Sequence, residues 1–243
     1  MIAKESGLHY NENMKTIVLL AGGKSSRMGK DKIFLPYRGT SFLEHLILRS
    51  SEVFDRVLIS AGSSQHAQQI RRFLEDSGAV PQDLVGGIIT DHYDSFGPAG
   101  GLMSVLEETG LEHFSVAAAD MPEADMRVLA YLLERLEELC GQDLAGQDHL
   151  PEDPARPSAP AAVMLQIHPE FPEPCAAAYS RTCYDLLREA AKDGIRSPMK
   201  ALGKSRILTV TEEELKRSSP VFAKLDLRQS FRNINTAEDY RLM

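Results

Sequence analysis

The segment from Leu20 to Lys32 contains the residue types that a protein uses to bind a triphosphate. It reads L-A-G-G-K-S-S-R-M-G-K-D-K. Glycine allows the backbone to approach phosphate closely, and cationic side chains offset the phosphate charge. A P-loop ending at Gly23-Lys24-Ser25 would need glycine at position 18, which is Val18, and no G-x-G-x-x-G is present. The residues therefore indicate either another kind of phosphate loop or a glycine-rich turn with a solvated basic face.

Asp120 is a candidate ligand-binding residue at the end of a predicted strand. It directly follows an apolar run, residues 115–119, and precedes Met121-Pro122. Ligands of parallel sheets bind beyond the carboxyl ends of the strands, and Mg²⁺ takes one or two carboxylates together with phosphates and waters. The alternative is that Asp120 only begins a turn or a helix.

Two further motifs are candidates for binding a ligand. Asp91 comes after a short apolar run and precedes the turn G-P-A-G-G-L, in which Gly97 is the first residue. The glycines allow this turn to close over a flat base, and Asp91 or the carbonyls of the turn could accept hydrogen bonds from that base. Near the other end of the sequence, N-I-N-T-A-E-D (residues 233–239) predicts a helix capped by Thr236, with Asn235 as a candidate for the metal or a substrate phosphate.

The elements that must position these residues alternate between strand and helix. Short apolar runs predict strands at residues 16–20, 57–60, 88–90, 115–119, 161–166 and 176–179. Helical spacing is found at residues 41–53, 65–76, 101–108, 125–138 and 181–192, and Ser41 with Glu44 forms a capping-box pattern. This alternation predicts an α/β fold with a mostly parallel central sheet.

We expect one domain over residues 15–243. Residues 1–14 are polar and without pattern, so we interpret them as a disordered leader. Residues 141–160 are rich in proline, glycine, alanine and aspartate and predict an exposed, proline-rich insert.

The composition is typical of a soluble globular protein. Of 243 residues, 43% are hydrophobic and 26% charged, and the net charge of −8 argues against nucleic acid or an anionic membrane as the main partner. Three cysteines without C-x-x-C spacing predict neither a disulfide framework nor a zinc site. With no apolar run of membrane-spanning length, we expect a cytoplasmic protein.

The motifs together resemble those of the molybdenum cofactor guanylyltransferases, a family within the nucleotidyltransferases. The resemblance rests on L-A-G-G-x-S-x-R-M-G-x-D-K-x-x-L through Leu35, on D-M-P at Asp120, and on the aspartate before G-P-x-x-G-L. The tail resembles N-x-N-T-P-E-D, with Ala237 in place of proline. The similarity covers roughly residues 15–140 and 161–241. It implies a Rossmann-like three-layer sandwich of the nucleotide-diphospho-sugar transferase type.

The resemblance also implies roles for individual residues. Arg27 would face the β- and γ-phosphates, and Lys32 would stabilise charge on the α-phosphoryl oxygens. Asp120 would bind Mg²⁺, with Asn235 as a second candidate ligand. Arg196 and Lys200, in and after a G-x-R-S segment, are candidates for contacting the acceptor. The nucleotide-binding residues implied are Leu20, Ala21, Gly22, Gly23, Lys32, Asp91, Gly97 and Asp120.

The function implied is transfer of GMP from GTP to the phosphate of molybdopterin, with release of pyrophosphate. GTP and molybdopterin would be the partners, together with molybdoenzyme chaperones or other cofactor-biosynthesis proteins. Three alternatives stay open at this point: cytidylyl transfer to the same pterin, nucleotidyl transfer to a sugar phosphate, and a non-catalytic module that binds and carries the pterin.

Overall fold

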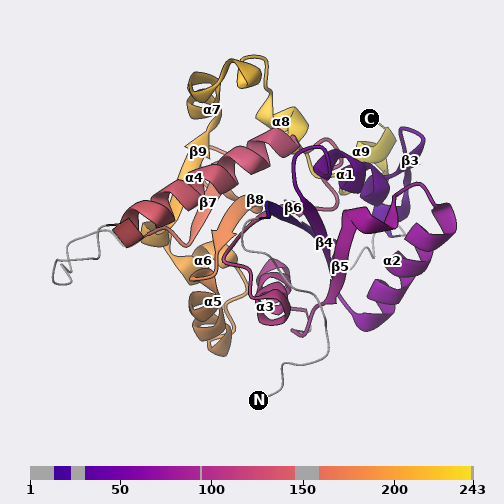
Figure 1. Ribbon diagram of the computed structural model, residues 1–243, viewed down its shortest axis with the longest axis horizontal. Helices are drawn as coiled ribbons and strands as arrows, with labels where there is room; N and C mark the ends of the chain where they lie inside the picture. The colour runs from indigo at the N-terminus through magenta and orange to yellow at the C-terminus, as the bar shows by residue number, and fades with distance from the viewer. Residues whose placement is uncertain (1–13, 23–30, 94, 146–158, 242–243) are drawn as a thin grey trace.

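A computed structural model describes residues 14–22, 31–93, 95–145 and 159–241 (Figure 1). Within these residues, the centre of the fold is a seven-stranded sheet in the order β5-β4-β1-β6-β8-β7-β9. β8 runs antiparallel to both of its neighbours, whereas every other pairing in the sheet is parallel. The mostly parallel sheet is therefore confirmed. The strands are β1 (Thr16–Leu20), β4 (Arg56–Ala61), β5 (Val85–Thr90), β6 (His113–Ala118), β7 (Ala162–Gln166), β8 (Glu173–Ser180) and β9 (Ile207–Thr211).

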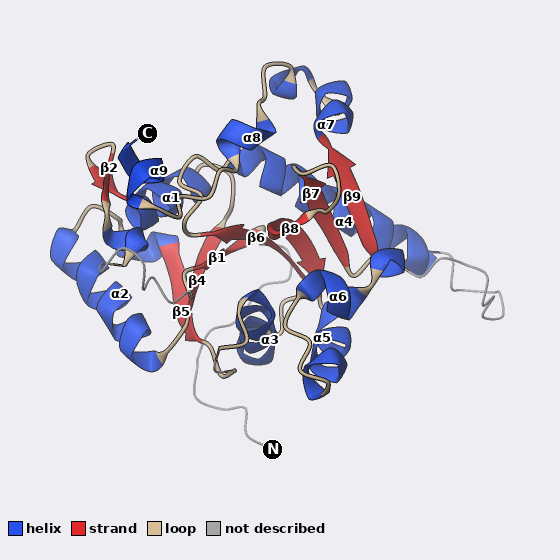
Figure 2. Ribbon diagram, turned by 180° about the vertical axis from the view of Figure 1, so that it is seen from behind, coloured by secondary structure: helices blue, strands red, loops and turns tan. Residues whose placement is uncertain are grey.

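Helices cover both faces of the sheet, which gives the three layers expected (Figure 2). One face carries α1 (Phe42–Ser50), α2 (Ser64–Ser77), α4 (Met126–Ala145), α7 (Glu212–Ser218) and α8 (Leu227–Ser230). The other face carries α3 (Pro98–Thr109), α5 (Cys183–Lys192) and α6 (Pro198–Leu202). A small hairpin of β2 (Pro36–Tyr37) and β3 (Thr40–Ser41) packs near α9 (Ala237–Arg241).

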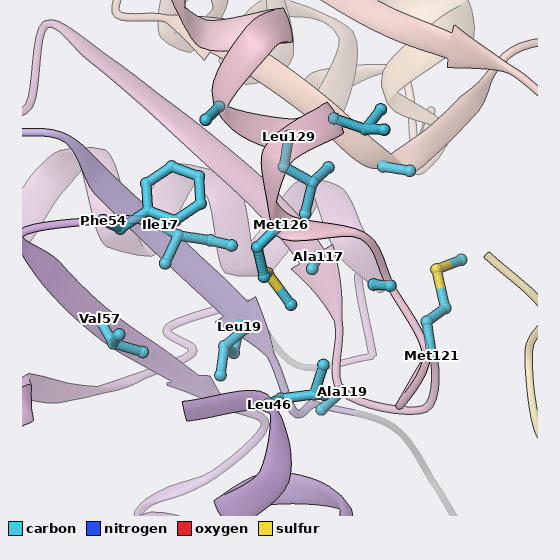
Figure 3. Packing of buried hydrophobic residues seen from close by; sticks show 14 of the residues in the cluster. Ile17, Leu19, Leu46, Phe54, Val57, Ala117, Ala119, Met121, Met126 and Leu129 are labelled. Carbon is cyan, nitrogen blue, oxygen red and sulfur yellow. The ribbon is translucent and has the colours of Figure 1, made fainter. Parts of the chain in front are cut away.

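The core is split by the sheet into two hydrophobic clusters. Alternate residues of β1 serve opposite faces: Ile17 and Leu19 belong to the α1/α4 side, and Val18 belongs to the α3 side. Figure 3 shows Leu19 among Leu46 and Met126 in the first cluster. Because the strand is buried on both faces, it has the continuous apolar sequence that parallel strands require.

Most of the predicted elements are confirmed to within a few residues, and one is corrected. α4 continues through Gly141 to Ala145, so the first part of the predicted insert is helix rather than loop. Leu139 and Cys140 pack against the core, and a single helical glycine is tolerated at modest cost. Residues 1–13 and 146–158 lie outside the described residues. β9, α7, α8 and the small hairpin were not predicted from the sequence.

The capping box of α1 yields a prediction about stability. Glu44 N donates to Ser41 Oγ at 3.2 Å and Ser41 N donates to Glu44 Oε2 at 2.7 Å, and both residues are buried. Ser41→Ala should lower the free energy of unfolding by about 1 kcal/mol in urea titrations, because an N-terminal amide loses its acceptor. Ser64→Ala, at the exposed start of α2, is the matched control and should change it far less. Equal effects of the two would contradict this account.

Candidate active site

A cavity of about 990 Å³ opens at the carboxyl ends of β1, β4, β5 and β6. Its walls also include the start of β8, the short helix η1 (Lys32–Phe34) with Asp31 before it, and residues 233 and 235 of the tail. This is the edge at which parallel sheets bind ligands. All of the described residues predicted for nucleotide and metal binding line this cavity: Leu20, Ala21, Gly22, Lys32, Asp91, Gly97, Asp120 and Asn235.

Lys32 joins two of the predicted residues. Its Nζ lies 3.3 Å from Asp120 Oδ2 and donates to Asn235 Oδ1 at 2.9 Å. The partners are 88 and 203 positions away in the sequence, so only the fold brings them together. The side chains of Lys32 and Asp120 are 16% and 28% exposed, which leaves the pair partly shielded yet open to the cavity.

The backbone around Asp120 fixes these positions. Ala119 N donates to Leu20 O at 3.0 Å, which extends the β1–β6 pairing to the cavity edge. Ile234 N donates to Asp120 O at 2.9 Å, and the Ile234 side chain is buried against Tyr37 and Phe42. The tail is thus anchored beside the metal candidate by both a hydrogen bond and an apolar contact.

The turn after Asn235 is held by a reciprocal cap. The Thr236 backbone N–H donates to Asp239 Oδ2 at 2.8 Å, and Asp239 N donates to Thr236 Oγ1 at 3.0 Å, as the sequence predicted. Hydrogen bonds from Thr236 and the Asn235 backbone lower the pKa of Asp239. The carboxylate therefore stays charged while it orients the segment that carries Asn235.

Both ends of the glycine-rich segment are anchored to β4 and α2. Ala21 N donates to Ser60 O at 2.9 Å, and a Cβ at Gly22 would lie 3.2 Å from Gly62 Cα, so the two strand ends approach closely. At the other end, Asp31 Oδ2 lies 2.8 Å from His66 Nε2. Residues 23–30, with the predicted Gly23 and Arg27, lie outside the described residues.

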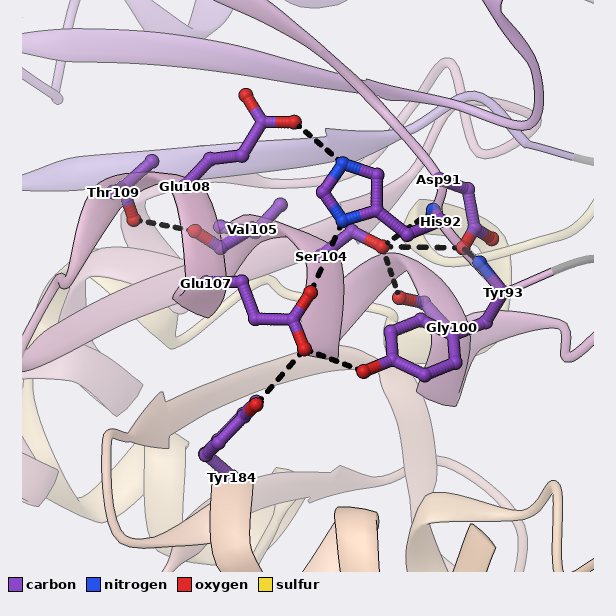
Figure 4. Close-up of polar contacts among 10 residues, drawn as sticks. All are labelled: Asp91, His92, Tyr93, Gly100, Ser104, Val105, Glu107, Glu108, Thr109 and Tyr184. Atoms are coloured by element: carbon purple, nitrogen blue, oxygen red, sulfur yellow. Dashed lines mark hydrogen bonds and ion pairs between the residues drawn. The ribbon is translucent and has the colours of Figure 1, made fainter. Parts of the chain in front are cut away.

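Asp91 forms hydrogen bonds that hold the turn after it, and the sequence predicted that Asp91 and this turn bind the base (Figure 4). Its Oδ1 accepts from Tyr93 N at 2.8 Å and from Ser104 Oγ at 3.2 Å. Gly97 has φ 65° and ψ −150°, a region essentially restricted to glycine, and it leads directly into α3. A Cβ at Gly100 would lie 3.0 Å from both Asp91 carboxylate oxygens, so this close approach requires glycine.

A second layer of polar contacts supports the Asp91 turn (Figure 4). His92 Nδ1 lies 3.1 Å from Glu107 Oε2, and its Nε2 lies 3.0 Å from Glu108 Oε1. The hydroxyls of Tyr93 and Tyr184 both donate to Glu107 Oε1. This cluster ties the loop after β5 to α3 and α5, and the hydrogen bond to Glu107 raises the pKa of His92.

Several cavity residues were missed by the sequence reasoning. Glu173 and Cys175 stand at the start of β8, where Cys175 N donates to Glu173 Oε1 at 3.0 Å. Burial, and to a smaller degree the charge of Asp120, raises the pKa of Glu173. Burial followed by the charges of Glu173 and Asp120 raises the pKa of Cys175, so its thiol stays protonated. The other missed residues include Ser60, Gly62, Ser63, His66 and Asn233.

The two acceptor candidates do not join the others. The guanidinium carbon of Arg196 lies 5.7 Å from the centre of the Phe96 ring, next to the Gly97 turn. Lys200 lies on α6. Neither is among the described residues that line the cavity, and their role stays a prediction.

The residues at the centre of the cavity fit a hard divalent cation. Asp120 Oδ2 and Asn235 Oδ1 both contact Lys32 Nζ, so two oxygen donors of the kind that Mg²⁺ and Mn²⁺ prefer lie near one another at the cavity. Across the described ranges, no group of three or more histidine, cysteine, aspartate or glutamate side chains is placed to hold a metal. A cation here would therefore take most of its ligands from phosphate and water.

Comparison with known proteins agrees with this geometry. The family model for the MobA-like NTP transferase domain matches residues 17–207. A molybdenum cofactor guanylyltransferase of Syntrophotalea carbinolica is 25% identical over 92% of this chain and 87% of its own length.

No helix of the described residues is long and apolar enough to cross a membrane.

Solved structures share the fold. The molybdopterin-guanine dinucleotide biosynthesis protein A of Archaeoglobus fulgidus superposes with a TM-score of 0.67 at 22% identity, covering 93% of this chain and 95% of that one. A Mycobacterium tuberculosis protein solved as a complex with manganese superposes with a TM-score of 0.51 at 17% identity, covering 95% and 97% of the two chains.

The His92 cluster yields a pH prediction. Because its pKa is raised in the folded state, His92 stabilises the fold fully below the ordinary histidine pKa of about 6.5, and this contribution is lost as pH rises through the raised value. The stability advantage of the natural protein over His92→Gln should therefore shrink as urea unfolding is repeated from pH 6 upward. An advantage that stays constant or grows with pH would contradict the assignment.

Proposed function

We propose, from the premise that this chain belongs to the MobA-like NTP transferase domain family, that it transfers GMP from GTP to the phosphate of molybdopterin. The chain is a nucleotidyltransferase, and the choice of these two substrates is supported by the relative named molybdenum cofactor guanylyltransferase. The observation that carries the proposal is the meeting of Lys32, Asp120 and Asn235 at the carboxyl edge of the sheet. Molybdoenzyme chaperones or other cofactor-biosynthesis proteins stay predicted partners.

In the proposed reaction, a phosphate oxygen of the acceptor attacks the α-phosphorus of GTP and pyrophosphate leaves. Nucleotidyl transfer needs positioning and charge stabilisation rather than a protein nucleophile. Lys32 offsets the negative charge that develops on the α-phosphoryl oxygens, and its low exposure strengthens that interaction. Asp120 and Asn235 would hold Mg²⁺, which supplies charge neutralisation to the phosphates when bound.

The nucleotide half of the cavity is assigned to the ends of β1, β4 and β5. Gly22 permits close backbone approach, and the Gly97 turn with the start of α3 forms the opposite wall. Gly97 has a backbone conformation that favours glycine, and the lack of a side chain there leaves room for a flat base. We assign Asp91 and the carbonyls of this turn to the guanine edge, and Arg27 to the outer phosphates.

The nucleotide is tested with a panel of triphosphates, purified molybdopterin and Mg²⁺, with pyrophosphate release as the readout. GTP should be used in preference to CTP, and chelation of the metal with EDTA should stop turnover. Preference for CTP would replace the guanylyl assignment with the cytidylyl one, and turnover with a sugar phosphate alone would replace the acceptor. Tight binding of the pterin without turnover of any triphosphate would favour the carrier.

Asp120→Asn tests the metal assignment. The substitution keeps the size of the side chain but removes the charge that would hold the cation, so kcat should fall about 100-fold or more, the equivalent of several kcal/mol. Glu123→Gln is the matched control, because Glu123 is 30% exposed against 28% for Asp120 and pairs with Arg38 at 2.7 Å. It should keep nearly full activity. Undiminished turnover in Asp120→Asn would show that the metal is held elsewhere.

A further inference from the structure

Glu173 is the first residue of β8, the strand that pairs with β6, and Asp120 follows the end of β6. In the β6–β8 pairing, Ala117 is the partner of Ala176. Because this pairing is antiparallel, it brings the end of β6 and the start of β8, and with them both residues, to the same edge of the sheet. Both residues line the same cavity.

Two observations on neighbouring groups agree with this placement. The charge of Asp120 acts on Glu173, and the charges of both residues act on the Cys175 thiol between the strand start and the cavity. Figure 1 likewise shows β8 beside β6 at the centre of the sheet. Both carboxylates therefore lie at one end of the paired strands β6 and β8 and line one cavity.

The charges around Glu173 are unbalanced in the described structure. Within the described residues Glu173 forms no ion pair, and its carboxylate is hydrogen-bonded by the Cys175 backbone N–H, which donates to Oε1 at 3.0 Å, and by the Cys175 thiol. The described cavity lining contains the carboxylates of Asp31, Asp91, Asp120 and Glu173, and Lys32 is its one lysine or arginine. The Lys32 ammonium pairs with Asp120, and Glu173 has no cationic partner among the described residues, so this pair of carboxylates favours the binding of a further positive charge.

We propose that Glu173 is a further metal-binding residue, which supplies a second carboxylate to the divalent cation of the Asp120 site. The inference rests on the proposed function, since that function assigns the cation to Asp120. The cation then has one carboxylate from the end of β6, one from the start of β8 and the Asn235 amide from the tail, with phosphate and water as its other ligands. Two carboxylates remain within the number that Mg²⁺ accepts in nucleotide sites.

A purely structural role for Glu173 can be distinguished from metal binding by a substitution. Its hydrogen bond to Cys175 N holds the start of β8, next to the register shift between Met164 and Leu165 in the β7–β8 pairing. Glu173→Gln keeps a carbonyl oxygen that can accept from Cys175 N but removes the charge. The variant should therefore fold normally, and thermal unfolding checks this directly.

The test is a calorimetric titration of Mn²⁺ into the full-length protein without nucleotide. Mn²⁺ affinity should fall about 10-fold in Glu173→Gln and at least as much in Asp120→Asn. Glu170→Gln, an exposed neighbour whose backbone N–H contacts His168, should bind as the natural protein does. If Glu173→Gln binds Mn²⁺ as tightly as the natural protein, including the case in which neither binds it measurably, the proposal is overturned.

The titration is independent of the choice of substrate. If GTP is not used in the triphosphate panel but Glu173→Gln still weakens Mn²⁺ binding, the guanylyl assignment is rejected and the metal inference is kept. If GTP is used but Glu173→Gln binds Mn²⁺ as tightly as the natural protein, the guanylyl assignment is kept and the metal inference is rejected.

Discussion

The contact of the Lys32 ammonium with Asp120 and Asn235 is the interaction on which the site depends. It draws together the segment after β1, the end of β6 and the tail, which are far apart in sequence. Partial burial strengthens the attraction between the charges, and the Ile234 hydrogen bond to Asp120 O keeps the tail in place.

The direction of each strand determines which of its ends lies at the cavity. β1, β4, β5 and β6 all end at the cavity, so the residues after them line the part that we assign to the nucleotide. β8 runs the other way, so its beginning rather than its end lies at this edge. The reversal explains why the first residue of one strand, Glu173, lines the same cavity as a residue that follows another strand, Asp120.

The nucleotide side could be predicted from the sequence because its residues follow strands that are easily recognised. The apolar run of β1 and the small-residue run of β6 located Lys32 and Asp120, and the capping pattern at Thr236 located the tail helix. The meeting of Asn235 with Lys32 depends on how the tail packs, which local sequence does not encode. Glu173 was missed because the direction of β8 cannot be derived from its composition. The roles of Arg27 and of the acceptor candidates Arg196 and Lys200 stay predictions.

The most direct measurement is a crystal structure of the protein with Mg²⁺ and a GTP analogue that cannot be cleaved between the α- and β-phosphates. The account predicts an Asp120 oxygen about 2.1 Å from the metal and Lys32 Nζ about 2.8 Å from an α-phosphate oxygen, with the guanine at the Gly97 turn. A nucleotide bound away from this edge of the sheet, or a metal held without Asp120, would contradict the account.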